Sequence, residues 1–210
     1  MDHQEYQYLN LIKDILENGS FEKTRNGTTK VLIGSCMRFT LKDGTIPILT
    51  TKKTAWKTCL KELLWLIKGS TSNKHLNDEN VHIWDKNSTS EFLETRNLQY
   101  KEGDLGPVYG FQWRHFDAKY IDCDTDYQTQ GIDQLKQVIN DLKNEETRTS
   151  RRLIVSAWNP NQIDQMALPP CHLLFQFHIK NNTHLSCTMY QRSGDVCLLY
   201  TSPSPRDSSK

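Results

Sequence analysis

The alternation of side chains between residues 172 and 190 constrains the fold of this chain more than any other feature. Every second residue is apolar in two runs on either side of Asn181-Asn182: Leu173, Phe175, Phe177 and Ile179 before it, Leu185, Cys187 and Met189 after it. A period of two around an Asn-Asn turn is typical of an antiparallel hairpin. Such a hairpin returns Gln191 and Arg192 towards Cys171.

The cysteine at the start of this hairpin has a distinctive setting. It lies in Pro169-Pro170-Cys171-His172, and the return strand ends in Gln191-Arg192-Ser193-Gly194-Asp195. A cysteine attacks as its thiolate, and because a free thiol has a pKa of about 8.5, a nucleophilic cysteine usually has a cation nearby. Arg192 is the candidate cation. The alternative is that Cys171 is a small buried hydrophobe, the commoner role of a free cysteine.

Composition limits the class of protein. The chain has 210 residues, 36% of them hydrophobic, which suits one domain with a substantial core, or at most two small ones. Its 26 basic and 25 acidic residues give a net charge of +1, which argues against a dedicated nucleic-acid surface. The start lacks the basic and apolar regions of a signal peptide, and no stretch approaches a membrane span. We expect a cytoplasmic location, with the nucleus as the alternative.

The cysteines do not form a recognisable framework. The six are scattered without a Cys-x-x-Cys pair: Cys36, Cys59, Cys123, Cys171, Cys187 and Cys197. That spacing favours neither a zinc site nor a secreted disulfide scaffold, so no metal is predicted. We interpret the five cysteines other than Cys171 as structural.

Periodicity predicts one α+β domain over residues 1–196. Helical spacing occurs over residues 9–16, ended by Gly19, over 56–67, ended by Gly69, and over 132–142. In the second of these segments the spacing predicts an apolar stripe of Trp56, Leu60, Leu63, Leu64 and Ile67. Ser88 and Glu91 have the spacing of a capping box that opens a short helix. Extended segments are expected over 31–41, closed by a turn at residues 42–44, and strands dominate after Arg152.

Five segments in one order resemble thymidylate synthase. They are KELLWLIKGSTS with its IWD sequel, EGDLGPVYGFQWRHF, SRR followed by LIVSAWNP, PPCH, and YQRSGD. The resemblance runs from about Tyr8 to Val196. It implies a single thymidylate-synthase-type domain with a mixed β-sheet flanked by helices, and a homodimer that uses one face of the sheet.

The resemblance also implies a reaction. Cys171 adds to C6 of the uracil ring of deoxyuridylate (dUMP), which makes C5 nucleophilic enough to attack the methylene carbon of 5,10-methylenetetrahydrofolate. The product is thymidylate (dTMP), so the enzyme is a methyltransferase. Folate is both the carbon donor and the reductant, and neither a nicotinamide nor a metal is required.

Further site residues follow from the resemblance. Glu62 matches a glutamate that organises proton transfer, and Tyr109 matches a tyrosine beside C5. Trp84 and Asp195 match folate contacts, and Asn87 stands where some relatives have a second tryptophan. The residues for the dUMP phosphate and base are Arg25, Gln191, Arg192, Ser193 and Asp195 from one subunit, with Arg151 and Arg152 from its partner. Arginine suits phosphate because its guanidinium binds two oxygens at once and stays charged.

Each of these residues also has a plainer interpretation. Charged residues usually lie at the surface, so Glu62 could be a solvated helix residue. Tyr109 and Trp84 could serve only as core aromatics. Adjacent arginines such as Arg151 and Arg152 are more often a solvated face than a binding site.

Two departures from the family pattern lead to further expectations. The loop from Arg25 to Lys30 is one residue shorter than usual. Residues 197–210 are rich in Ser and Pro, which predicts an unstructured tail of artefactual origin in place of the family's C-terminal portion. The resemblance implies that the asparagine that recognises the uracil edge belongs to that portion, so the chain as given is expected to be inactive. The alternatives are a deoxycytidylate hydroxymethylase, a noncatalytic dimerising or nucleotide-binding fragment and, remotely, a cysteine hydrolase.

Overall fold

The structure is a computed structural model that describes residues 3–24 and 27–196. The described residues divide into two compact units: residues 3–24, 27–56 and 195–196 form the first, and residues 57–194 form the second. The expectations for Arg25 and for the tail 197–210 lie outside the described residues. None of the helices in the described ranges is long and apolar enough to cross a membrane.

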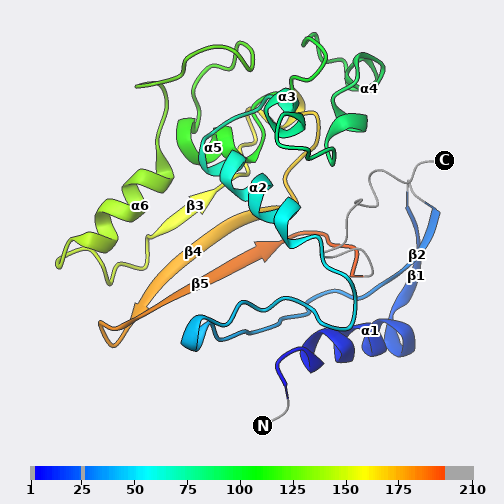
Figure 1. The fold of residues 1–210 in the computed structure, drawn as a ribbon, viewed down its shortest axis with the longest axis vertical. Coiled ribbons are helices and arrows are strands. Elements are labelled where there is room, and N and C mark those ends of the chain that lie inside the picture. Colours follow the sequence, from blue (N-terminus) through cyan, green and yellow to red (C-terminus); the bar gives the residue numbers. More distant parts are fainter. Residues whose placement is uncertain (1–2, 25–26, 197–210) are drawn as a thin grey trace. The chain divides into compact units, whose positions relative to one another are not determined.

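The first unit begins with the predicted helix. It contains α1 (Tyr6–Asn18), β1 (Ser20–Thr24), β2 (Gly27–Val31) and the 3-10 helix η1 (Lys42–Gly44), all labelled or traceable in Figure 1. The amide of Gly19 donates to the carbonyl of Ile15 and ends α1, as expected. β1 and β2 pair antiparallel, with Ser20 opposite Val31. The turn at 42–44 is confirmed, but residues 32–41 form no regular strand.

Glu5 fastens the start of α1 to a later segment of the same unit. Its carboxylate accepts hydrogen bonds from the amide and hydroxyl of Thr50, at 2.8 and 2.6 Å, and from those of Thr51, at 3.0 and 2.8 Å. All four donors favour the charged carboxylate. The hydroxyl of Thr50 contributes most, and together the donors lower the pKa of Glu5 from 4.5 to about 2.

This lowered pKa predicts an acid-sensitive first unit. The stabilisation by ionised Glu5 is complete above a pH of about 4.5, its value in the unfolded chain, and is lost as the pH falls towards about 2. We expect the Glu5→Gln variant to be less stable than the parent at pH 7 and to lose less stability on acidification. Thermal unfolding of both proteins between pH 7 and pH 3 measures this difference. A constant difference in midpoint across that range would contradict the assignment.

The second unit contains the remaining helices and a three-stranded sheet. Its helices are α2 (Trp56–Ile67, shared at its first residue with the other unit), α3 (Asn73–Asn77), η2 (Asp85–Asn87), α4 (Ser90–Thr95), α5 (Tyr109–His115), α6 (Gln134–Lys143) and η3 (Ile163–Gln165). The predictions of α2 and α6 are confirmed. The capping box at Ser88 is wrong: the N-cap of α4 is Thr89, whose hydroxyl oxygen accepts from the amide of Phe92. Ser88 is instead buried and donates to the carbonyl of Asp85.

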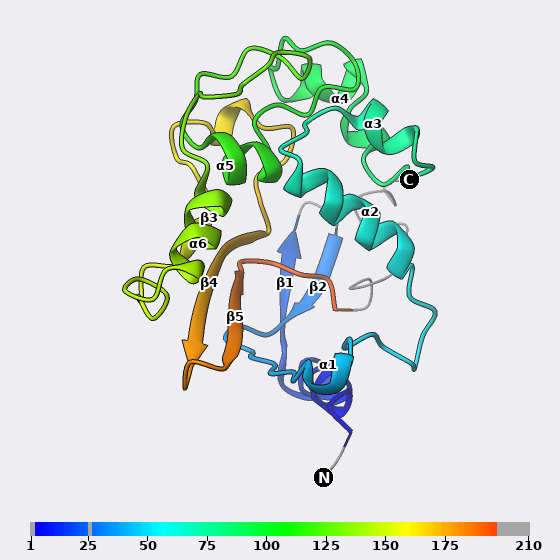
Figure 2. The same ribbon diagram turned by 60° about the vertical axis from the view of Figure 1, so that its left-hand side comes forward.

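The sheet contains the predicted hairpin. β3 (Ile154–Ser156), β4 (His172–Lys180) and β5 (His184–Gln191) lie in that order, and Figures 1 and 2 show β4 and β5 side by side. Phe175 lies opposite Met189, and the turn places Asn181 and Asn182 at positive φ, as asparagine tolerates. The α+β class is confirmed. The prediction of one mixed sheet is wrong for the described strands, which form two antiparallel sheets, because each strand pairs with its neighbour in sequence.

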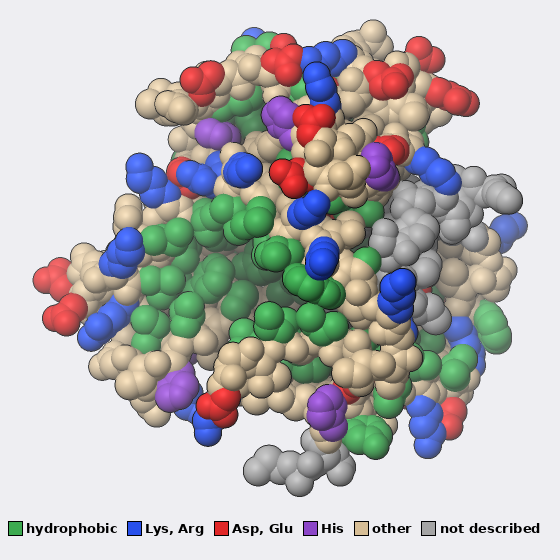
Figure 3. Space-filling model, viewed as in Figure 1, with side chains coloured by type: hydrophobic (Ala, Val, Ile, Leu, Met, Phe, Trp, Pro, Cys, Tyr) green, Lys and Arg blue, Asp and Glu red, His purple; other side chains and the backbone are tan. Residues whose placement is uncertain are grey.

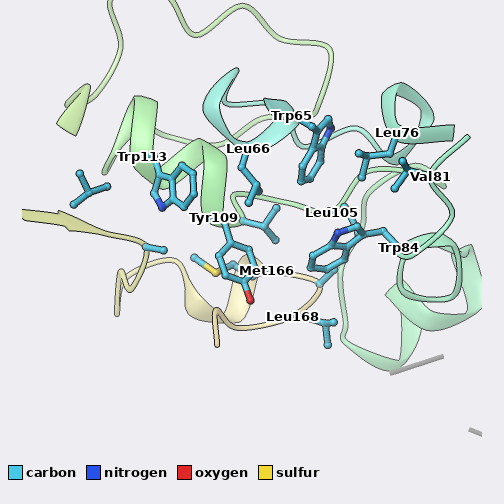
Figure 4. Close-up of a cluster of buried hydrophobic side chains, with 14 of the residues drawn as sticks. Trp65, Leu66, Leu76, Val81, Trp84, Leu105, Tyr109, Trp113, Met166 and Leu168 are labelled. Atoms are coloured by element: carbon cyan, nitrogen blue, oxygen red, sulfur yellow. The ribbon is translucent and has the colours of Figure 1, made fainter. Parts of the chain in front are cut away.

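The main core of the second unit lies between its helices and the sheet. Figure 4 shows Trp65 and Leu66 of α2 beside Tyr109 and Trp113 of α5, and all four belong to one buried cluster. The helices approach closely because position 110 is glycine: a Cβ there would lie 2.4 Å from the carbonyl oxygen of Leu66. The contact is with backbone, which cannot move aside as a flexible side chain can.

The predicted apolar stripe of α2 is only partly used in packing. Its members are exposed by 36 to 49% in the structure: Trp56, Leu60, Leu63, Leu64 and Ile67. The buried residues are Trp65 and Leu66 instead. Figure 3 shows hydrophobic side chains open to the surface in the region that α2 and the sheet occupy in Figure 1. Periodicity identified a common face, but that face is not the one that the described chain covers.

Candidate active site

Cys171 and Arg192 are brought together as predicted. Cys171 directly precedes β4, Arg192 directly follows β5, and the amide of Arg192 donates to the carbonyl of Cys171 at 2.9 Å. The guanidinium Nη2 lies 3.7 Å from the sulfur of Cys171. Cys171 is half-buried, whereas Arg192 is exposed. The hairpin therefore places a cation beside an accessible thiol, as is usual for a nucleophilic cysteine.

The two prolines before Cys171 fix this arginine. Its Nε donates to the carbonyl of Pro170 at 2.8 Å, and Nη2 donates to that of Pro169 at 3.1 Å. Proline contributes a carbonyl acceptor without a competing amide donor. The Pro-Pro-Cys sequence thus supplies both the nucleophile and the acceptors that orient the guanidinium.

Tyr109 fixes the backbone of the cysteine from the other side. Its phenol oxygen, which points away from Trp65 in Figure 4, accepts a hydrogen bond of 2.8 Å from the amide of Cys171. The Tyr109 ring stacks on the ring of His172, with centroids 4.3 Å apart. Tyr109 is buried in the core of the unit, so the cysteine is anchored to α5. The interpretation of Tyr109 as a core aromatic and its assignment to the site are both consistent with this position.

Glu62 and Trp84 lie together next to this tyrosine. The indole N–H of Trp84 donates to the carboxylate of Glu62 at 2.8 Å, and the Trp84 ring meets that of Tyr109 edge-on, with centroids 6.3 Å apart. Trp84 is buried and Glu62 is half-buried. A chain of contacts therefore runs from Glu62 through Trp84 and Tyr109 to Cys171. Asn87, in η2, is buried, and its carbonyl oxygen has no hydrogen-bond partner among the described residues.

The other predicted residues have varied positions. The side-chain amide of Gln191 donates to the carbonyl of Ser193 at 2.9 Å, directly beside Arg192. Arg151 and Arg152 are exposed just before β3, held through their backbone by Gln176 and Ser150. None of their hydrogen bonds in the described chain reaches Cys171. Asp195 is exposed and belongs to the other compact unit.

The sequence did not single out Trp158 or the buried amides of Gln112, Asn159 and Gln162. Gln112 donates to Gln162 at 2.7 Å and to the carbonyl of Pro107, and Asn159 donates to both glutamines. This network joins α5 to the loop between β3 and Cys171. Gln112 lies in the run GFQWRHF, and Trp158 and Asn159 lie in SAWNP, but neither run indicates which residues these side chains contact, and Gln162 lies outside both.

Two other features of the described chain do not coincide with these residues. A polar cavity of about 420 Å³ lies in the second unit, lined by Ser72, Lys74, His75, Asp78, Lys101, Glu102, Gly103, Cys123 and Asp124. It includes none of the predicted site residues. Within the described ranges, no group of three His, Cys, Asp or Glu side chains has the arrangement of a metal site.

Comparison with known proteins assigns the chain to a family. The model of the family described as thymidylate synthase matches residues 6–201. The chain belongs to the thymidylate synthase family. The thymidylate synthase of Agaricus bisporus is 50% identical over 204 residues, which cover 93% of this chain and 68% of that protein.

Bifunctional relatives of the family match equally well. The bifunctional dihydrofolate reductase-thymidylate synthases of Paramecium tetraurelia and Zea mays are 52 and 50% identical, over 94 and 93% of this chain. The chain spans 42 and 37% of the length of these two proteins. The family assignment therefore applies to the residues matched, and the activity of a whole relative becomes a proposal for this chain.

Proposed function

We propose that the chain carries the site for reductive methylation of dUMP to dTMP by 5,10-methylenetetrahydrofolate, through a covalent adduct at Cys171. The observation that carries the proposal is the position of the Cys171 sulfur, 3.7 Å from the Arg192 guanidinium at an accessible surface. A thiolate held beside a cation is a suitable nucleophile for C6 of a pyrimidine, and the same cation suits a nucleotide phosphate. Family membership supports this chemistry over that of a cysteine hydrolase.

The residues around Cys171 have distinct roles in this proposal. The thiolate forms a bond to C6, and the electrons of the C5–C6 double bond make C5 nucleophilic. Tyr109 holds the amide of Cys171 and thereby the direction of attack. Glu62 accepts from the indole N–H of Trp84, and we assign its carboxylate to proton transfer near the pyrimidine.

Bound 5,10-methylenetetrahydrofolate would supply the one-carbon unit and the hydride that reduces it. The described residues fit a pterin in one respect: the buried carbonyl oxygen of Asn87 is left without a partner, and pterins carry N–H donors. Trp84 fits less directly, because its ring is buried and its N–H is taken by Glu62. We therefore propose that Asn87 accepts from the folate and that Trp84 orients Glu62. Asp195 remains a proposed folate contact.

Substrate binding is proposed to require two chains. Gln191, Arg192 and Ser193 would bind dUMP from one protomer, together with Arg25. Arg151 and Arg152 would reach the same phosphate from the partner: both are exposed, and none of their hydrogen bonds within the described residues involves Cys171 or Arg192 of their own chain. A two-fold homodimer then contains two complete phosphate sites. We propose a cytoplasmic protein.

Hydrogen exchange at C5 of dUMP tests the nucleophile without folate. Addition of Cys171 to C6 makes C5 basic, so reversible addition in D₂O replaces the C5 proton with deuterium, which mass spectrometry detects. We expect exchange with dUMP in a protein that carries the family's C-terminal portion in place of residues 197–210, and formation of dTMP when 5,10-methylenetetrahydrofolate is added. The activity variants described below are made in the same protein. Exchange with deoxycytidylate but not dUMP would favour a hydroxymethylase. Binding of dUMP without exchange would reject covalent catalysis and favour a noncatalytic nucleotide-binding chain.

A further inference from the structure

Arg192 has a third neighbour that differs from its hydrogen-bond partners. The guanidinium carbon lies over the indole ring of Trp158, 5.9 Å from its centroid. Within residues 3–24 and 27–196, its guanidinium donates to the carbonyls of Pro169 and Pro170, and its Nη2 lies beside the sulfur of Cys171. These described partners carry no formal negative charge while Cys171 is a thiol, so they do not neutralise the charge of the arginine.

Trp158 is itself held in place from two elements. It follows β3, and its amide donates to the hydroxyl oxygen of Ser156 at 3.2 Å, while that hydroxyl donates to the carbonyl of Trp158. The side chain of Gln134 in α6 bonds both the amide and the carbonyl of Ser156. Trp158 is half-buried. The backbone that carries the indole is therefore held by hydrogen bonds at the end of β3.

The carbonyls of Pro169 and Pro170 restrain the guanidinium only through its N–H groups. An exposed arginine has several rotamers, and holding it in one of them costs conformational entropy. The face of an indole attracts a guanidinium by its quadrupole and excludes water from one side of it. Without the Trp158 ring, we expect the Arg192 guanidinium to move away from the Cys171 sulfur, even though the carbonyls of Pro169 and Pro170 remain in place.

We propose that Trp158 is a positioning residue whose ring holds the Arg192 guanidinium beside the sulfur of Cys171. The inference rests on the proposed role of Cys171 as the nucleophile, but it concerns only the position of the Arg192 guanidinium relative to the Cys171 sulfur. A cation next to a thiolate accelerates attack on an anionic reagent relative to a neutral one of similar size. The ratio of these two rates at Cys171 therefore reports the position of Arg192.

The test compares alkylation of Cys171 by iodoacetate and by iodoacetamide, followed peptide by peptide with mass spectrometry. Replacing Trp158 by Leu should lower the iodoacetate-to-iodoacetamide ratio at Cys171 about fivefold, close to the value in Arg192→Gln. The Trp158→Phe variant keeps an aromatic face and should stay within about twofold of the parent. Cys187, which is exposed on β5, is the internal control, and its ratio should not change.

The possible results are distinguishable. Circular dichroism first establishes that each variant is folded, and Trp158→Met replaces Trp158→Leu if the latter is not. An unchanged ratio in the aliphatic variant, with a lowered ratio in Arg192→Gln, would overturn the role of Trp158. An unchanged ratio in Arg192→Gln would also overturn it, because the charge of Arg192 would then have no effect on Cys171 for Trp158 to control. Failure of the proposed function appears separately, as absent C5 exchange in a protein whose alkylation ratio responds as expected.

Discussion

Replacement of Cys171 by alanine is expected to abolish C5 exchange and thymidylate formation, a loss of about 10⁴-fold or more, because no other thiol in the described chain lies beside Arg192. The affinity for dUMP should change by less than about threefold, because the phosphate contacts do not need the sulfur. Exchange, turnover and equilibrium dUMP binding should be measured on the same preparation. A loss of binding as large as the loss of exchange would point to a structural role for Cys171.

The Cys187→Ala variant is the matched control. Cys187 lies on β5 of the same hairpin and is exposed as a residue, but partial desolvation raises the pKa of its thiol, which opposes thiolate formation. We expect its exchange rate to stay within about twofold of the parent, since no step of the proposed reaction uses it. Substantial exchange in Cys171→Ala that disappears in the double variant would transfer the nucleophile to Cys187.

Two inactive variants are expected to restore activity when their subunits are mixed. If Arg152 serves the partner's phosphate, Arg152→Ala and Cys171→Ala should each be nearly inactive alone. In a heterodimer one site has both lesions, and the other combines an intact Cys171 with an intact Arg152 from across the interface. Random exchange at equal concentrations makes half of the dimers mixed, so activity should recover to about a quarter of the parent value.

Recovery is measured as C5 exchange or dTMP formation against the mixing ratio, with differently tagged chains to establish subunit exchange. Arg148→Ala is the matched control: Arg148 is a nearby arginine that forms an ion pair with Glu145 of its own chain, so this variant should be active without mixing. Proven heterodimers without recovery would place Arg152 in the site of its own chain, or in none. In either case the proposal of a shared phosphate site would be wrong.

The hairpin could be predicted from the sequence because its information is local. The period of two and the Asn181-Asn182 turn are both readable over a short stretch, and they bring Gln191 and Arg192 back to the start of β4. The approach of Arg192 to Cys171 could therefore be predicted from the pattern, before any resemblance is considered. The final pairing of Gln191 with His172 could not, because it depends on a register shift between His172 and Leu174.

Other parts depend on contacts between distant segments. Helical spacing grouped Leu60, Leu63 and Leu64 on one face of α2, but periodicity does not tell which face the rest of the chain covers, and Trp65 and Leu66 are buried instead. The N-cap of α4 is one residue later than predicted, because the hydroxyl of Ser88 donates to the carbonyl of Asp85 in the preceding turn. Trp158 follows β3 and Arg192 follows β5, and no rule of sequence spacing predicts their contact.

The close passage of α5 over α2 also has a genetic consequence. Every amino acid other than glycine would bring a Cβ at position 110 to within 2.4 Å of the Leu66 carbonyl oxygen, whatever the rest of its side chain. Such overpacking costs about 1–3 kcal/mol or more, and here it would also shift the neighbouring Tyr109 that holds Cys171. We therefore expect codon 110 to tolerate only synonymous change: the nucleotide sequence can drift there, but its translation cannot.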